Sequence, residues 1–207
     1  MDDAKRREFY GIMLADSDRL LGTIEQVLRA GRSSPSKRRI ERIPIDLPEL
    51  VRECMTLART RHHLGGDAIR FTQSVPADAP ATVVGDLDEI KAAVSNLLDN
   101  AIKYSGANVR VRVETALVDD KQVAVRVTDE GVGIPKLELK RIFRRFYRIP
   151  GTVAMRVKGT GLGLFIVRSV AERHGGRAFA ESAGAGMGST FTLQLPSPTR
   201  KEAERNS

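Results

Sequence analysis

Two neighbouring segments of alternating apolar and polar residues constrain the fold of this chain most. They are Val109–Glu114 and Val123–Thr128, and a short polar stretch around Asp119-Asp120 lies between them. Alternation with a period of two is typical of a strand that buries one face and exposes the other. The two segments therefore predict two strands joined by a turn, and their buried face needs other elements to cover it.

Helical and strand-like segments flank this pair on both sides. Helices are predicted from Pro48 to about Arg61, from the cap residue Asp86 to Tyr104, and from about Leu162 to His174. The other predicted strands are Ile43–Leu47, Ala68–Ser74, Thr82–Val84, Arg177–Glu181 and Thr190–Leu195. This order of elements predicts an α/β (α+β) fold, a two-layer α/β sandwich in which helices cover one face of a mixed sheet.

A single amphipathic helix is predicted ahead of this domain, from Glu8 to Arg29. Met13, Leu20 and Val27 recur every seven residues, as in a helical bundle or coiled coil, although Ser17 interrupts the apolar stripe. One such helix is marginally stable in water, so we expect its stripe to be exposed or covered only by a partner. The expected boundaries are a bundle helix in 1–32, a linker in 33–42, the α/β domain in 43–196 and a disordered tail in 197–207.

Composition and charge argue against several classes of protein. The chain has no run of eighteen or more apolar residues and starts with charged residues, so we expect neither a membrane span, nor contact with a membrane, nor a secretory signal. The single cysteine, Cys54, excludes an internal disulfide and fits a reducing, cytoplasmic setting. The net charge is +8, but basic residues are spread along the chain and aromatic residues make up only 5%, so we expect no nucleic-acid partner.

The predicted helix that ends at Tyr104 presents polar side chains on one face. Asn96, Asn100 and Lys103 fall at positions i, i+4 and i+7, whereas Leu97 and its apolar neighbours can face the sheet. An amide oxygen is a ligand suited to Mg²⁺, and a lysine one turn further on can reach a phosphate. Taken alone, these residues are explained more simply by a solvated helix face.

Three glycine-rich segments follow in the sequence, and each alone could be an ordinary turn. In Asp129–Pro135, a carboxylate at the end of a strand can accept a hydrogen bond from an amine such as that of adenine. Gly159–Leu164 opens a helix whose free N–H groups suit an anion, but no strand precedes it and no P-loop lysine follows. Gly184–Thr190 leads into the last predicted strand.

In this order and spacing, the four segments resemble the N, G1, G2 and G3 boxes of one ATPase superfamily. The superfamily, whose fold is of the Bergerat type, is shared by gyrase, a heat-shock chaperone, mismatch-repair proteins and histidine kinases. Phe143 and Phe146 resemble the F box found particularly in histidine kinases. The resemblance covers about residues 40–196, and it implies that ATP is the substrate and Mg²⁺ the cofactor.

The resemblance also implies a role for individual residues. Asn100 is expected to bind Mg²⁺ with support from Asn96, Lys103 to contact phosphate, Tyr104 to pack near the nucleoside and Asp129 to bind the adenine amine. Residues from about 144 to 160 are expected to form a mobile lid. The other expected ATP contacts are Gly131, Gly133, Ile134, Arg148, Lys158, Gly159, Thr160, Gly161, Leu162, Gly163, Leu164 and Thr190.

Asn96 separates the branches of the superfamily. In the hydrolytic members and in related serine kinases, a glutamate at this position acts as a general base towards water or a hydroxyl. An amide cannot take up a proton, whereas a neutral imidazole needs little help as a nucleophile. Asn96 therefore favours a histidine kinase; a partner-binding module of the same fold and an autonomous ATPase remain the alternatives.

No histidine of this chain matches the phosphoacceptor motif of histidine kinases, which is similar to His-Glu-x-x-x-Pro. His62 and His63 precede Leu-Gly-Gly, and His174, before two glycines, is interpreted as a structural residue at a helix end, where a cation would favour the dipole. Residues 8–32 resemble only the second helix of the dimerisation and phosphotransfer hairpin. We therefore expect the first helix, with its histidine, to precede Met1 in a longer parent; a short kinase that acts on another chain is the alternative.

The resemblance implies that the γ-phosphoryl group of ATP passes to that histidine and then to an aspartate of a response regulator. The expected partners are therefore ATP, the histidine-bearing dimerisation domain and the receiver domain of the regulator. The parent is expected to be a homodimer, either cytoplasmic or anchored in the inner membrane. Without the acceptor histidine, this chain is expected to bind ATP but to autophosphorylate negligibly.

Overall fold

A computed structural model describes residues 42–74, 81–106, 108–119, 121–150, 157 and 159–198 of the chain. All of them belong to one compact unit, Arg38–Ser207. The predicted bundle helix, most of the linker, Lys158 and part of the predicted lid lie outside the described residues. Ser197, predicted to lie in a disordered tail, is instead buried, and its hydroxyl donates to the Thr82 carbonyl at 2.8 Å.

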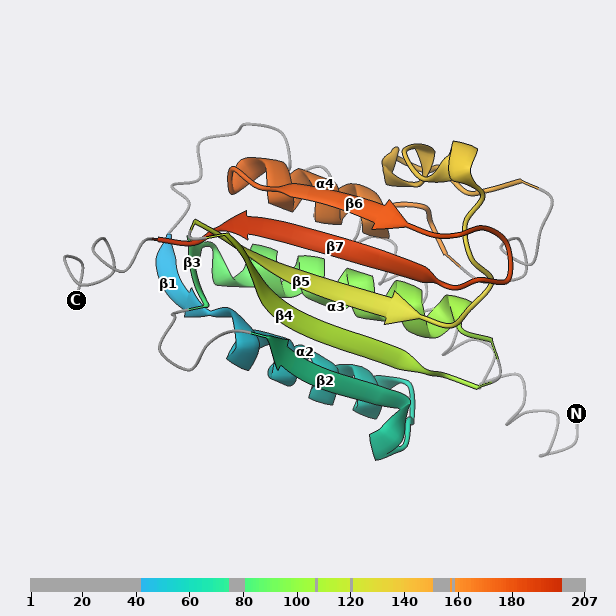
Figure 1. Cartoon of the computed structure of the whole chain (residues 1–207), viewed down its shortest axis with the longest axis horizontal. Coiled ribbons are helices and arrows are strands. Elements are labelled where there is room, and N and C mark those ends of the chain that lie inside the picture. The colour runs from blue at the N-terminus through green and yellow to red at the C-terminus, as the bar shows by residue number, and fades with distance from the viewer. Residues whose placement is uncertain are drawn as a thin grey trace, which may run out of the picture. The chain divides into compact units, whose positions relative to one another are not determined.

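The main sheet has five strands in the order β2-β4-β5-β7-β6. The strands are β2 (Ile69–Ser74), β4 (Val111–Asp119), β5 (Gln122–Asp129), β6 (Arg177–Glu181) and β7 (Ser189–Pro196). Strand β2 runs parallel to β4, and the other neighbours are antiparallel, so the sheet is mixed, as predicted (Figure 1). Strands β1 (Ile43–Asp46) and β3 (Thr82–Gly85) pair only with each other, antiparallel.

Three helices lie on one face of this sheet, which confirms the predicted two-layer arrangement (Figure 1). They are α2 (Leu47–Arg61), α3 (Leu87–Tyr104) and α4 (Gly163–Arg173). The carboxylates of Asp46 and Asp86 cap α2 and α3 by accepting the N–H groups of Glu49 and Glu89, at 2.9 and 3.1 Å. Helix α4 has no side-chain cap, so its first N–H groups stay free of such a partner.

The hydrophobic core lies between the helices and the sheet. Val113, Val127 and Phe191 are aligned across β4, β5 and β7, and all are buried. Leu97 and Leu98 of α3 are at most 1% exposed, as expected for the face that covers the sheet. The polar face of α3, which carries the predicted site residues, is thereby turned away from the core.

His174 fixes the end of α4 to the start of α3. Its Nδ1–H donates to the Val170 carbonyl at 2.8 Å, and its Nε2 accepts the backbone N–H of Asp86 at 3.1 Å. These two contacts agree with the predicted structural role of His174. Gly85 makes room for the ring, since a Cβ atom there would lie 2.5 Å from Cδ2 of His174.

Replacing His174 by alanine is expected to lower the free energy of unfolding by about 2 kcal/mol, because the Asp86 N–H loses its acceptor and the buried ring is removed. Urea denaturation of the purified protein measures the change. His63→Ala is the matched control: His63 is exposed, and its replacement should change stability by less than about 0.5 kcal/mol. Equal effects of the two substitutions would contradict the structural role of His174.

Candidate functional site

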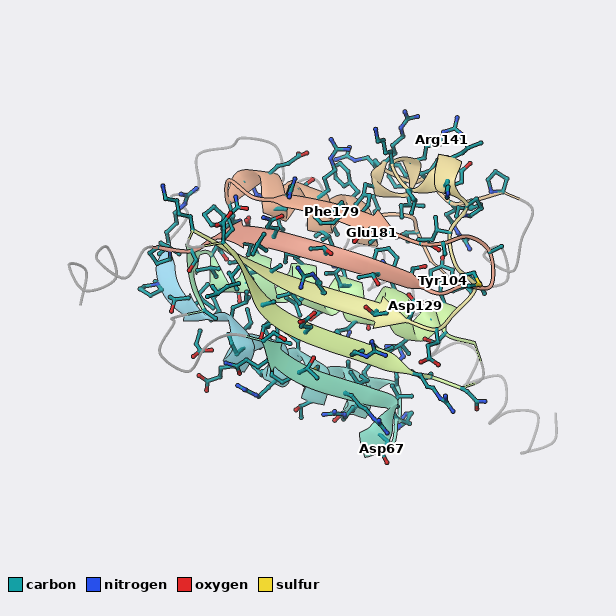
Figure 2. All side chains as sticks on the ribbon, in the orientation of Figure 1. Asp67, Tyr104, Asp129, Arg141, Phe179 and Glu181 are labelled. Carbon is teal, nitrogen blue, oxygen red and sulfur yellow. The ribbon has the colours of Figure 1, made fainter. Side chains whose placement is uncertain are left out.

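Three segments that are distant in the sequence meet where β5 ends. The N–H of Val132, just after β5, donates to the carbonyl of Tyr104 at the end of α3, at 3.2 Å. In the β6–β7 connection, Gly186 N donates to Val132 O at 2.7 Å and Gly188 N to Gly131 O at 3.2 Å. Figure 2 shows Tyr104 and Asp129 close together at this end of the sheet.

Asp129 is the chemical centre of this region. The residue is 3% exposed, and its Oδ1 atom accepts the N–H of Gly131 at 2.9 Å. Its Oδ2 atom is buried and has no hydrogen-bond partner among the described residues. Burial raises the pKa of Asp129 above its ordinary value of 3.8, and the backbone N–H groups of Gly131 and Ser189 partly oppose this rise. A donor placed beside Oδ2 would therefore be strongly favoured.

Glycines allow the three segments to approach this closely. A Cβ atom on Gly131 would lie 2.1 Å from the Tyr104 carbonyl oxygen, and one on Gly188 would lie 2.1 Å from that of Asp129. Gly133 has a φ of +67°, and a Cβ atom there would lie 2.0 Å from the Gly184 oxygen. Gly131 and Gly133 were expected to contact ATP; in this structure they lie against the backbone of a neighbouring segment.

The polar face of α3 meets the start of α4. Asn96 donates from Nδ2 to the Ala92 carbonyl of its own helix at 2.8 Å. A Cβ atom on Gly163, the first residue of α4, would lie 2.9 Å from Asn96 Oδ1 and 3.7 Å from Asn100 Nδ2. The two amides therefore lie against an uncapped helix N-terminus, whose N–H groups suit an anion. Lys103, one turn beyond Asn100, is exposed.

The F-box residues pack against the segment that precedes α4. Phe143 is buried, whereas Phe146 is 62% exposed and has a φ of +61°. The Phe146 N–H donates to the Gly161 carbonyl at 3.0 Å, and a Cβ atom on Gly161 would lie 2.7 Å from the Phe146 carbonyl carbon. The Arg145 guanidinium lies 4.8 Å from the centre of the Phe165 ring, on the first turn of α4.

The predicted site residues thus fall into two groups. Asp129, Gly131, Gly133, Ile134 and Tyr104 surround the end of β5, as described above. The second group lies around the start of α4 and consists of Asn96, Asn100, Gly161, Leu162, Gly163 and Leu164. Three other predicted residues, Arg148, Gly159 and Thr160, precede α4 in the chain. Gly159 is exposed, Thr160 is half-buried, and Arg148 donates to the Val157 carbonyl at 2.5 Å.

The predicted contact of Thr190 with the site does not agree with the strand register. Thr190 pairs with Thr128, and their hydroxyl groups lie 3.0 Å apart on the sheet face opposite to Asp129. Ser189 is the residue that pairs with Asp129 and is buried beside it. Phe191 indicates this register in the sequence. Residues two positions apart on a strand lie on the same face, so Ser189 shares the buried face with Phe191.

Asp129→Asn is expected to raise the free energy of unfolding by about 1 kcal/mol at neutral pH, because it removes a buried charge. The folded protein keeps the Asp129 proton to a higher pH than the unfolded chain, so wild-type stability falls as pH rises above 3.8 towards the raised pKa. The advantage of the variant should grow through that range. Urea titrations at several pH values measure it, with Asp67→Asn, at an exposed aspartate, as the control.

Gly131→Ala is expected to lower the free energy of unfolding by about 2 kcal/mol, because the added methyl group overlaps the Tyr104 carbonyl. Gly65 offers a matched comparison, since it has φ −66° and no atom within 4 Å of an added Cβ. Gly65→Ala should be neutral or stabilise by less than about 1 kcal/mol. Thermal unfolding of both variants distinguishes the two cases.

Comparisons with known proteins agree with this arrangement. Residues 85–199 match the family described as "Histidine kinase-, DNA gyrase B-, and HSP90-like ATPase". The sensor-like histidine kinase SenX3 of Mycolicibacterium smegmatis is 34% identical over 92% of this chain, and the histidine-protein kinase BarA of Escherichia coli is 31% identical over 92%. The chain covers 48% of the first relative and 21% of the second, so it spans at most about half of these proteins.

Solved structures of the same type have similar folds. The mycobacterial sensor histidine kinase MprB is 32% identical, with a TM-score of 0.62, and the match covers 75% of this chain and 97% of that one. Full-length ShkA, solved in complex with AMPPNP, has a TM-score of 0.74 and 25% identity over 93% of this chain and 39% of its own. No described helix is long and apolar enough to cross a bilayer. The chain therefore belongs to the histidine kinase-, DNA gyrase B- and HSP90-like ATPase family, and it contains the ATP-binding catalytic domain of a sensor histidine kinase.

Proposed function

We propose that Asp129 recognises the adenine base of ATP. The observation that carries this proposal is the Oδ2 atom of Asp129, buried and without a partner among the described residues. The exocyclic amine of adenine is a donor of the right size for a carboxylate at a strand end, and it would remove the cost of the unpaired acceptor. The AMPPNP complex of the related kinase ShkA supports an adenine nucleotide as the ligand.

The phosphates are proposed to lie between α3 and the first turn of α4. The uncapped N–H groups of α4 can donate to phosphate oxygens, and Lys103 adds a positive charge one turn beyond Asn100. Arg148, Lys158 and Thr160 stay predicted phosphate contacts. This division puts the base at the buried end of β5 and the charged groups at the more open helix ends.

The donor set of α3 fits Mg²⁺, with Asn100 as the proposed ligand and Asn96 beside it. The described residues hold no group of three or more His, Cys, Asp or Glu side chains that could hold a metal ion. Mg²⁺ usually keeps several waters and phosphate oxygens and needs few protein ligands, so one or two amide oxygens suffice. When bound, the ion neutralises the negative charge of the phosphates.

The proposed reaction transfers the γ-phosphoryl group of ATP to a histidine of the dimerisation domain of the parent kinase. The bond from the γ-phosphorus to the bridging oxygen breaks, ADP leaves, and a bond to an imidazole nitrogen forms. Asn96 cannot act as a base towards water, which disfavours hydrolysis but leaves a neutral imidazole free to attack. This domain contributes positioning and charge neutralisation, which dominate phosphoryl transfer.

The proposed partners follow from this reaction. They are the histidine-bearing dimerisation domain, within a homodimeric parent, and the receiver domain of a response regulator whose aspartate accepts the phosphoryl group. The parent is proposed to work in the cytoplasm, either free or anchored in the inner membrane. The kinase relatives SenX3 and BarA support this assignment.

Calorimetric titration with ADP and AMPPNP, with and without Mg²⁺, tests the proposal. We expect micromolar, Mg²⁺-sensitive binding, and we expect Asn100→Ala and Asp129→Asn each to weaken it at least about tenfold, a loss of about 1.4 kcal/mol. Asn108→Ala and Asp67→Asn, at exposed positions, are the matched controls and should bind as the wild type does. If neither site variant weakens binding, the proposed site is wrong.

The same samples separate the alternative functions. A folded chain that binds no nucleotide would favour the partner-binding module. Steady ATP hydrolysis well above that of Asn100→Ala would favour an autonomous ATPase. For a histidine kinase domain, we expect nucleotide binding with negligible hydrolysis and negligible autophosphorylation of this chain.

A further inference from the structure

Ser182, the residue after β6, has a hydroxyl group with a complete set of hydrogen bonds. The Oγ atom accepts the N–H of Ile134 at 3.0 Å and that of Gly184 at 3.3 Å. The hydroxyl lies 2.6 Å from the Gly188 carbonyl and 3.3 Å from that of Gly184, so its single proton goes to Gly188. A serine hydroxyl has one donor and two acceptor positions, and all three are used here.

These hydrogen bonds join the two loops that surround Asp129. Ile134 lies at the end of the loop that follows β5, and Gly188 lies at the end of the loop that precedes β7. The loops also share the two backbone hydrogen bonds described above, from Gly186 and Gly188. Ser182 adds the only described side-chain hydroxyl that bonds to both loops at once. Figure 2 labels its neighbour Glu181 at the end of β6.

The hydrogen bond from Ser182 to the Gly188 carbonyl also affects the surroundings of the Asp129 carboxylate. The carbonyl of Gly188 and the N–H of Ser189 belong to the same planar peptide group, so fixing one fixes the other. The Ser189 N–H is one of the two backbone groups that stabilise the charged form of Asp129. The other is Gly131 N–H, at 2.9 Å from Oδ1, in the loop held by Ile134. The Ser182 hydroxyl therefore fixes the peptide group that carries the Ser189 N–H and holds the loop that carries the Gly131 N–H.

We propose that Ser182 is a positioning residue for adenine recognition, acting through these two loops on the direction in which Asp129 Oδ2 points. This inference rests on the proposed function of Asp129. Without the hydroxyl, the Gly188 peptide can rotate and the buried Ile134 N–H loses its acceptor. The carboxylate then loses its fixed orientation, and the contact with the exocyclic amine weakens while contacts with the phosphates stay.

The test compares two nucleotides in the full chain. ADP carries the exocyclic amine, and purine riboside 5′-diphosphate lacks it. Calorimetric dissociation constants are measured for both with wild type, Ser182→Ala, Ser182→Thr and Asp129→Asn. Ser74→Ala is the matched control, because the Ser74 hydroxyl also donates a hydrogen bond, at 2.8 Å to Glu114. Ser74 lies away from the site: it pairs with Ala116 of β4, whereas Asp129 pairs with Val111 at the start of that strand.

For Ser182→Ala we expect about a tenfold weaker affinity for ADP, with at most about a twofold change in the affinity for purine riboside 5′-diphosphate. Ser182→Thr keeps the hydroxyl and should keep the preference for ADP. In the Asp129→Asn background, Ser182→Ala should cause no further loss of preference, because the two residues act in one chain of contacts.

Three results would overturn the inference while the proposed function stands. They are an unchanged preference for ADP in Ser182→Ala, an equal loss of affinity for both nucleotides, and a threonine variant as impaired as the alanine variant. If the wild type itself does not prefer ADP to purine riboside 5′-diphosphate, the proposed role of Asp129 fails as well. If Ser182→Ala does not fold, the near-isosteric Ser182→Cys, a weak donor, replaces it, and an unchanged preference in that variant also overturns the inference.

Discussion

A buried carboxylate oxygen that has no hydrogen-bond partner among the described residues is the constraint on which the arrangement of this domain depends. Asp129 ends β5, the middle strand of the sheet, so strands on both sides and helices on one face shield it from water. Burying such a group costs free energy, and most proteins avoid it. The Gly131 N–H holds Oδ1, whereas Oδ2 has no hydrogen-bond partner among the described residues. The adenine recognition proposed for Asp129 is therefore opposed to stability at this residue.

Close backbone contacts convert three separate loops into one surface around that oxygen. At Gly131, Gly133 and Gly188, a side chain would overlap a carbonyl oxygen of another segment. These glycines therefore determine tertiary contacts and not only the shape of a turn. Ser182 also holds these loops together, but through a side-chain hydroxyl and not through backbone groups. Both devices reduce the freedom of loops that ordinarily move.

The sequence allowed the layer architecture to be predicted, but less of the local detail. Period-two alternation located β4 and β5. It did not show that β4 continues to Asp119, because Thr115 and Ala116 are both buried and break the alternation. No local sequence pattern indicates that β1 pairs with β3 apart from the main sheet. Adjacent hydroxyl residues made Ser189 and Thr190 look equivalent, although a shift of one residue along a strand changes the sheet face. Ser182 could not be found, because its role depends on contacts between distant segments.

The contacts of α4 link both ends of the helical layer. Its first residue lies against Asn96, and its last turn holds His174 against Asp86 and Arg173 against Glu89, at 3.1 Å. The Arg173 carbonyl also accepts a hydrogen bond from Arg42, where the described chain begins, at 3.1 Å. Helix α3, with 18 residues, spans roughly 27 Å at 1.5 Å per residue. An axial displacement of α4 would therefore have to carry Asp86, Glu89 and Arg42 with it or break these contacts.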